Sequence, residues 1–193
     1  VIIGADSHTC TYGGLGAFAT GVGSTDLAAA WALGETWFKV PETLHFIYYG
    51  QLPPFVSAKD LILYTIGRIG VDGALYRAME FSGEAVAQLS VEGRLTLCNM
   101  AVEAGAKNGI VAPDAATLAY VNARAAWPFK VYASDPDASY AGVYEWNVTE
   151  LEPQVAVPHL PSNSKNVREL SDVTIDQVII GSCTNGRLED LRV

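Results

Sequence analysis

Cysteine, basic charge and long apolar runs are all scarce in this sequence of 193 residues, and each scarcity excludes a class of protein. The 3 cysteines, Cys10, Cys98 and Cys183, are odd in number and widely spaced, so they form no disulfide framework and favour a reducing, cytoplasmic setting. Lysine and arginine number 12 against 21 acidic residues, so we expect binding neither to nucleic acid nor to an anionic membrane surface. No apolar run reaches the ~18 residues of a membrane span.

Apolar residues are plentiful, at 50% of the sequence, so a sizeable core can be buried. Apolar runs alternate with amphipathic stretches, which predicts an α/β fold with mainly parallel sheets. Strands are expected at residues 1–3, 43–50, 76–81, 109–112, 130–132, 144–151 and 178–181. Helices are expected near residues 24–34, 57–69, 90–105 and 113–126, with a short one within 13–23.

Both ends of the chain have the composition of regular elements, an apolar strand at Val1 to Ile3 and the first turns of a helix at Leu188 to Val193. We therefore expect the chain to be part of a longer protein. Composition shifts at Val40-Pro41, and the polar stretch Pro153 to Asp172 is interpreted as a linker. The expected division is the end of a first α/β unit at 1–40, a middle α/β domain at 41–155, and a linker with the start of a third unit at 156–193.

Two runs of polar residues follow expected strands, where parallel sheets place their ligand sites. Asp6-Ser7-His8-Thr9 supplies a carboxylate and an imidazole that can exchange protons near neutral pH. The alternative is an ordinary turn in which Asp6 caps the loop and His8 is solvated. Cys183, after the strand at 178–181, suits a thiolate nucleophile or a metal ligand, and the alternative is an inert buried thiol.

Asn99 and Glu103 lie four residues apart in an expected helix, so both are predicted to share one face among apolar neighbours. A carboxylate in such surroundings needs a partner, although a solvated helix face remains the alternative. Gly14, Gly16 and Ala19 formally match a dinucleotide-binding pattern. Because the glycines start about ten residues after the strand, close helix packing is the favoured interpretation.

In this order the motifs resemble those of the aconitase superfamily: Asp6-Ser7-His8-Thr9, Gly13 to Gly16, Cys98-Asn99-Met100 with Glu103, and Gly181 to Asn185. Within it the runs Val91 to Ala101 and Gly186 to Arg192 are most similar to the large subunits of 3-isopropylmalate dehydratase and homoaconitase-type relatives. The resemblance covers essentially the whole chain. It implies three-layer α/β/α units and a hydro-lyase that isomerises a small hydroxy acid by dehydration and rehydration.

The resemblance also implies a [4Fe–4S] cluster, held by three cysteines, and a small-subunit partner. It assigns catalytic roles to Asp6, His8 and Glu103, substrate contacts to Ser7, Asn99 and Asn185, and the first cluster ligand to Cys183. Glu103 is expected to pair with His8, and Asn185 to shape the cluster loop.

This sequence departs from the family's pattern because it contains no C-x-x-C, and Cys10 and Cys98 do not match ligand positions. We therefore expect that the chain alone cannot hold the cluster. Isopropylmalate, homoaconitate and methylmalate-type substrates all remain open. So do two other functions: a nucleotide-binding oxidoreductase that uses the Gly14 region, and an inert scaffold or interaction domain.

Overall fold

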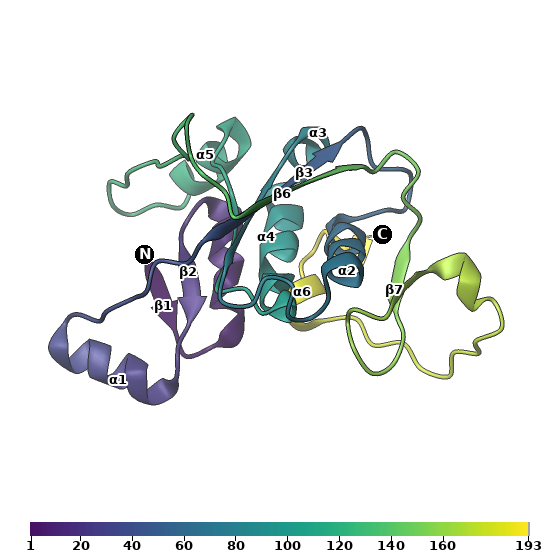
Figure 1. The fold of residues 1–193 in the computed structure, drawn as a ribbon, viewed down its shortest axis with the longest axis horizontal. Helices are drawn as coiled ribbons and strands as arrows, with labels where there is room; N and C mark the ends of the chain where they lie inside the picture. The colour runs from purple at the N-terminus through teal and green to yellow at the C-terminus, as the bar shows by residue number, and fades with distance from the viewer. Residues whose placement is uncertain (193) are drawn as a thin grey trace.

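Parallel strands form the two sheets on which the fold is built, in a computed structural model that describes residues 1–192 (Figure 1). The smaller sheet pairs β1 (Ile2–Gly4) with β2 (Ala19–Gly21). The larger sheet has the order β5-β4-β3-β6, and every neighbouring pair is parallel. Its strands are β3 (Thr43–Tyr49), β4 (Ala78–Ser82), β5 (Asn108–Val111) and β6 (Gly142–Asn147). The expectation of an α/β fold with mainly parallel sheets is confirmed.

Helices begin close to the caps that the sequence predicts. Ser57 and Asp60 form a capping box at one helix, the Ser90 side chain accepts a hydrogen bond from Gly93 N at another, and Asp114 caps a third. The α-helices are α1 (Ser24–Leu33), α2 (Ala58–Ile69), α3 (Glu84–Gln88), α4 (Val91–Asn99), α5 (Ala115–Asn122) and α6 (Ser182–Asn185). The 3₁₀ helices are η1 (Ser7–Leu15), η2 (Met100–Ala104), η3 (Val167–Leu170) and η4 (Asp190–Arg192). Within residues 1–192 we find no helix with the length and apolarity to cross a bilayer.

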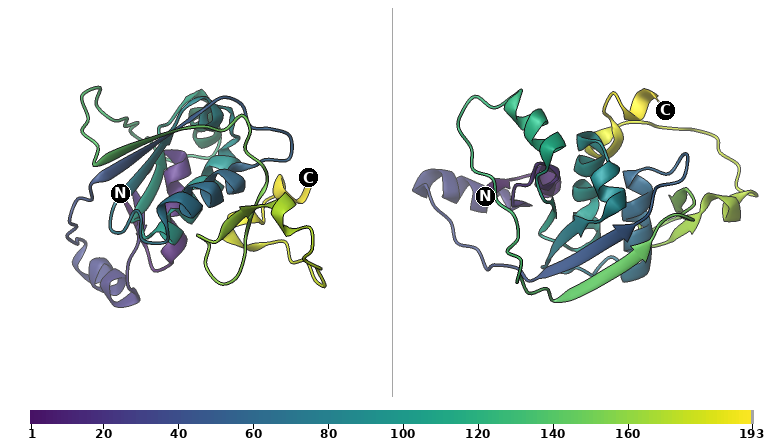
Figure 2. Two further views of the ribbon diagram at one scale, coloured as in Figure 1. Left: turned by 45° about the vertical axis from the view of Figure 1, so that its right-hand side comes forward. Right: turned by 90° about the horizontal axis from the view of Figure 1, so that it is seen from above.

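The main core lies between the larger sheet and helices α2 and α4, which cover one of its faces (Figure 2). Phe46 is fully buried there and stacks on Tyr144, with ring centroids 4.9 Å apart. The buried hydroxyl of Tyr48 bonds to Thr65 on α2 at 2.6 Å. This core fixes α4, which ends at Asn99 and lies against the elements that carry the other predicted site residues.

Three sequence-based expectations are wrong in the segments outside this core. Residues 130–132 form no strand, and residues 153–172 are more than a linker. They contain an antiparallel hairpin of β7 (Gln154–Ala156) and β8 (Ser164–Asn166), tied to α2 where the Asp60 carboxylate accepts a hydrogen bond from Gln154 N at 2.7 Å. The turn-forming residues in that stretch are as common in the loops of hairpins as in linkers.

The third error concerns the stretch before Cys183. Residues 178–181 are extended but unpaired, and Val178, Ile179 and Ile180 are 71%, 83% and 63% exposed instead of buried. A strand is defined by hydrogen bonds to a neighbour, and no described strand lies beside this one. In Figure 2 the segment leaves the hairpin as an open length of chain and returns to α4 at its far end.

Glycines in η1 allow its backbone to lie directly on α4 and β5. A Cβ on Gly14 would lie 2.7 Å from Leu95 N and 2.8 Å from the carbonyl carbon of Arg94. A Cβ on Gly13 would overlap the carbonyl oxygen of Gly109. The favoured interpretation of this glycine run, close helix packing, is confirmed.

Gly14→Ala should therefore lower the free energy of unfolding by about 1–3 kcal/mol, because the added methyl group meets rigid backbone. Gly181→Ala is the matched control, since a Cβ there has nothing within 4 Å. Urea denaturation followed by circular dichroism measures both. Equal stability of the two variants would contradict the packing described here.

Candidate functional site

The Asp6-Ser7-His8 run forms the start of η1, immediately after β1. Asp6 caps this helix, and its Oδ1 accepts a hydrogen bond from His8 N at 2.7 Å. Thr9 Oγ1 donates to Asp6 O at 2.7 Å. The two interpretations of this run, a turn capped by Asp6 and a polar site, therefore both apply. The capped turn fixes the direction of the His8 imidazole.

The imidazole of His8 points toward Glu103, and its Nε2 lies 3.4 Å from Glu103 Oε1. Its Nδ1 lies 3.2 Å from Ser7 Oγ and 3.7 Å from Asp6 Oδ1. A carboxylate can only accept, so the neutral ring carries its proton on Nε2 and accepts at Nδ1 from Ser7. The His8 and Glu103 side chains are 28% and 38% exposed, so solvent or a small molecule can reach the pair.

The spacing of Asn99 and Glu103 predicted that both lie on one continuous α-helix, and this prediction is wrong. Helix α4 ends at Asn99 and continues as η2, which the left-handed Gly105 terminates at φ 80°. Tightening of the last turn to 3₁₀ geometry is common at helix ends. Both side chains still face η1, since Asn99 contacts Thr11 while Glu103 contacts His8.

Asn99 is completely buried, and both ends of its amide have partners. Its Nδ2 donates to Thr11 Oγ1 at 2.7 Å, and its Oδ1 accepts from Thr184 Oγ1 at 2.7 Å. Thr11 Oγ1 donates onward to His8 O at 2.6 Å. A chain of hydrogen bonds therefore connects the Cys183 turn to the backbone of His8.

Cys183 is an exposed free thiol on α6, whereas Cys10 and Cys98 are free and buried. Burial raises the pKa of Cys10 to about 11, with a smaller contribution from the neighbouring Cys183. Burial also raises the pKa of Cys98 well above its usual value. Cys10 stays a protonated donor, with its Sγ 3.3 Å from Asn99 O.

The thiols permit a direct test of whether the described residues fit a [4Fe–4S] cluster. Such clusters take three or four thiolates, and this part of the chain presents one accessible thiol. Residues 1–192 include no group of three histidine, cysteine or acidic side chains arranged around a common metal position. Cys183 therefore fits the role of a single ligand, and the other ligands are not supplied by the described residues.

Asn185 lies beside this thiol. Its Nδ2 donates to Asp190 Oδ1 at 2.8 Å, while its Oδ1 is buried without a hydrogen-bond partner in residues 1–192. The bond to Asp190 helps to close the turn that carries Cys183.

Three residues that hold this site together carried no signal of their own in the sequence: Thr11, Thr96 and Arg187. Single threonines are common in any chain, so Thr11 and Thr96 could not be singled out. Arg187 belongs to the run that resembles the family, but its role became apparent only from its bonds to Thr96, Thr184 and Cys183.

The dinucleotide-binding alternative is wrong for this glycine run. Gly14 is packed against the backbone of α4, and a Cβ on Gly16 would overlap the ring of Pro113. A dinucleotide fold uses its glycines to let a pyrophosphate approach the backbone, and here other parts of the protein occupy that space.

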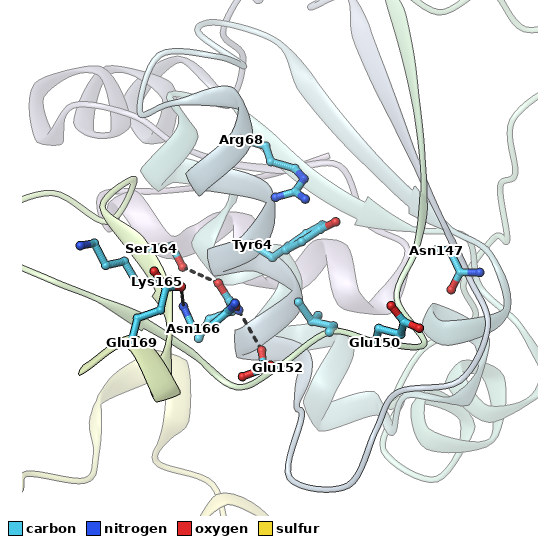
Figure 3. A pocket seen from close by; sticks show the side chains of 11 residues that line it. Tyr64, Arg68, Asn147, Glu150, Glu152, Ser164, Lys165, Asn166 and Glu169 are labelled. Carbon is cyan, nitrogen blue, oxygen red and sulfur yellow. Dashed lines mark hydrogen bonds between the residues drawn. The ribbon is translucent and has the colours of Figure 1, made fainter. Parts of the chain in front are cut away.

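Two cavities differ in their relation to the site. A polar groove of about 450 Å³ lies between α2 and the β7–β8 hairpin, and none of the predicted site residues lines it (Figure 3). Gln154, Ser164 and Asn166 in this groove bond to one another. A cavity of about 380 Å³ is lined by Ser7, with Lys107 and Asp26 as its charged residues, and it adjoins the His8 region.

Comparison with known proteins places the chain in one family. The model of the aconitase family (aconitate hydratase) matches residues 1–171. The 3-isopropylmalate dehydratase large subunits of Desulfitobacterium hafniense and Heliobacterium modesticaldum are 70% and 68% identical to the chain. That of Pyrococcus furiosus, large subunit 1, is 64% identical. Each comparison covers 100% of this chain and 46% of the relative, so the chain spans about half the length of these curated relatives.

The contrast between thiols gives a prediction for the folded protein at pH about 8, just below the ordinary pKa of a cysteine. Of the three thiols in this chain, we expect Cys183 alone to react rapidly with an aromatic disulfide reagent, because Cys10 and Cys98 are buried and protonated. Peptide mass spectrometry identifies the modified residue, and denaturant should expose all three. Rapid modification of Cys10 in the folded protein would contradict the described packing.

Proposed function

The chain belongs to the aconitase family, and from that premise we propose that it forms part of the large subunit of a cluster-dependent hydro-lyase, 3-isopropylmalate dehydratase of leucine biosynthesis. The observation that carries the proposal is the convergence of the His8–Glu103 pair, Asn99 and the exposed Cys183 around η1. The proposed enzyme is cytoplasmic, works with a small-subunit partner and contains a [4Fe–4S] cluster. The proposed division of this chain is 1–40, 41–155 and 156–193.

His8 is proposed to hold and move a proton at the reacting centre. Its Nε2 proton faces the Glu103 carboxylate, and its Nδ1 faces Ser7 and Asp6. Either ring state finds a partner at Nδ1, because Ser7 can donate to the neutral ring and Asp6 can accept from the imidazolium. Such a pair can accept the proton released when water is added and return it when water is lost.

Cys183 is proposed to be one ligand of the cluster. When bound, the cluster would supply a Lewis acid for the substrate's hydroxyl and carboxylate. Ser7 lines the neighbouring cavity, and its one hydroxyl proton is free to bind a substrate carboxylate when the His8 ring is protonated and Asp6 accepts from Nδ1. Asn185 is proposed to shape the loop around the cluster, because its Nδ2 bonds Asp190 in the same turn and its Oδ1 is buried. Asn99, buried and fully bonded, acts here by fixing the distance between η1 and α6.

The names of the relatives favour one of the family's substrates. Relatives 64–70% identical to the chain are named 3-isopropylmalate dehydratase large subunits, which supports isopropylmalate over homoaconitate or a methylmalate-type acid. The inert-scaffold alternative concerns this chain in isolation, so the next experiment uses the complete protein.

Anaerobic reconstitution of the complete protein with iron and sulfide should produce the visible absorption of a cluster, and Cys183→Ser should abolish it or reduce it strongly. Cys98→Ala is the control, because it removes a buried thiol that has no access to a cluster. Absorption unchanged in Cys183→Ser would remove Cys183 from the ligand set.

Glu103→Gln in the reconstituted enzyme, with its small subunit, should lower kcat about 10²-fold or more, because His8 loses its carboxylate partner. Cluster absorption should remain. Dehydration of isopropylmalate gives an unsaturated dicarboxylate, whose ultraviolet absorbance measures the rate. Glu92→Gln, in the first turn of the preceding helix α4, is the control and should keep full activity. Equal rates for the two variants would contradict the proposed role of Glu103.

A further inference from the structure

The turn that carries Cys183 is not supported by the chain that leads into it. Residues 178–180 are exposed and unpaired. A Cβ on Gly181 would have nothing within 4 Å, so the approach to the turn is open on that side. Among residues 1–192, the contacts that hold the turn therefore lie on its other side, where it packs against α4 (Figure 1).

Those contacts centre on the guanidinium of Arg187. Its Nη1 donates to Thr184 O at 2.7 Å and to Thr96 Oγ1 at 2.9 Å. Its Nη2 donates to Cys183 O at 3.0 Å. One planar group thus binds two successive carbonyls of the turn and a hydroxyl of α4.

The hydroxyl that Arg187 binds is itself part of the attachment. Thr96 is 2% exposed, and its Oγ1 donates to Thr184 O at 2.8 Å. Arg187 Nη1 and Thr96 Oγ1 therefore share the same carbonyl oxygen. Because Thr96 is withdrawn from water, loss of the guanidinium leaves a buried acceptor without its charged donor.

We propose that Arg187 is a positioning residue: it fastens the Cys183 turn to α4 and so sets the place of the thiol relative to His8. That the turn carries a cluster ligand rests on the proposed function, whereas the attachment of the turn to α4 by Arg187 does not. Lysine cannot replace arginine here, because a single ammonium group lacks the planar fork that reaches two carbonyls and a hydroxyl together.

The test uses the complete protein in its iron-free form and measures hydrogen exchange of a peptide spanning residues 182–191. Arg187→Met and Arg187→Lys should both speed exchange of this peptide by about tenfold, the loss expected when a charged hydrogen-bond donor is removed. Arg192→Met removes an arginine from the same segment and should leave the peptide unchanged. A peptide covering β3 reports whether the core remains folded.

A second measurement is specific to the thiol. The alkylation rate of Cys183, read from its own peptide, should rise in Arg187→Met and Arg187→Lys and stay at the original value in Arg192→Met. If millimolar guanidinium slows alkylation again in Arg187→Ala, whereas the same concentration of ammonium does not, the planar fork itself is responsible.

The outcomes separate the two proposals. Unchanged exchange and alkylation in Arg187→Met overturn the fastening role, and so does an equal effect of Arg192→Met. If the β3 peptide also exchanges faster in Arg187→Met, that variant has lost stability throughout, and Arg187→Lys becomes the test. Unchanged exchange of residues 182–191 in Arg187→Lys would then contradict the role of the guanidinium fork. Local loosening together with absent iron uptake by the original protein would uphold the fastening and refute the proposed function.

Discussion

The backbone of η1 lies against the backbone of α4 because Gly13 and Gly14 have no side chains to separate them. Everything proposed for the site depends on this approach. It brings His8 within 3.4 Å of Glu103 and places Thr11 within hydrogen-bond distance of Asn99. Since protein interiors are densely packed and shift little, a separation of one methyl group would move all of these contacts at once.

Buried polar groups then make the arrangement specific. Asn99 is withdrawn from water, so each end of its amide needs a partner, and the partners come from η1 and α6. A slip of either element would leave an amide unpaired, which costs about 1–3 kcal/mol. The apolar core positions α4, while these hydrogen bonds determine which residues of η1 and α6 face it.

Local sequence signals predicted the elements whose stability is local. Ser57 with Asp60, and likewise Ser90, mark helix starts because their side chains satisfy the first backbone N–H groups. The larger sheet was predictable because its strands are apolar over the length that one buried face requires. The resemblance, together with the need of a carboxylate for a partner, was enough to predict the pairing of His8 with Glu103, which the structure places 3.4 Å apart.

The features of the site that could not be predicted from the sequence depend on contacts between residues distant in the chain. The helical spacing of Asn99 and Glu103 was right about their shared direction but wrong about the helix, because the change to 3₁₀ geometry follows from how the turn ends at Gly105. Thr96 is recognisable as a partner of the Cys183 turn only once α4 and α6 lie together, and Thr11 as a partner of Asn99 only once η1 lies on α4. Their roles are created by the tertiary fold.

The stretch before Cys183 shows the same dependence most clearly. Its apolar residues predict a buried strand, yet Ile179 is 83% exposed, since apolar composition makes a strand only where another strand completes the hydrogen bonds. The turn that follows is held nonetheless, because its attachment runs through Arg187, Thr96 and Asn99 and not through a sheet. Arg187 and side chains of α4 thus hold the turn although residues 178–181 pair with no described strand. Because α4 runs directly into η2, which carries Glu103, the segment that holds the Cys183 turn also positions the carboxylate that faces His8.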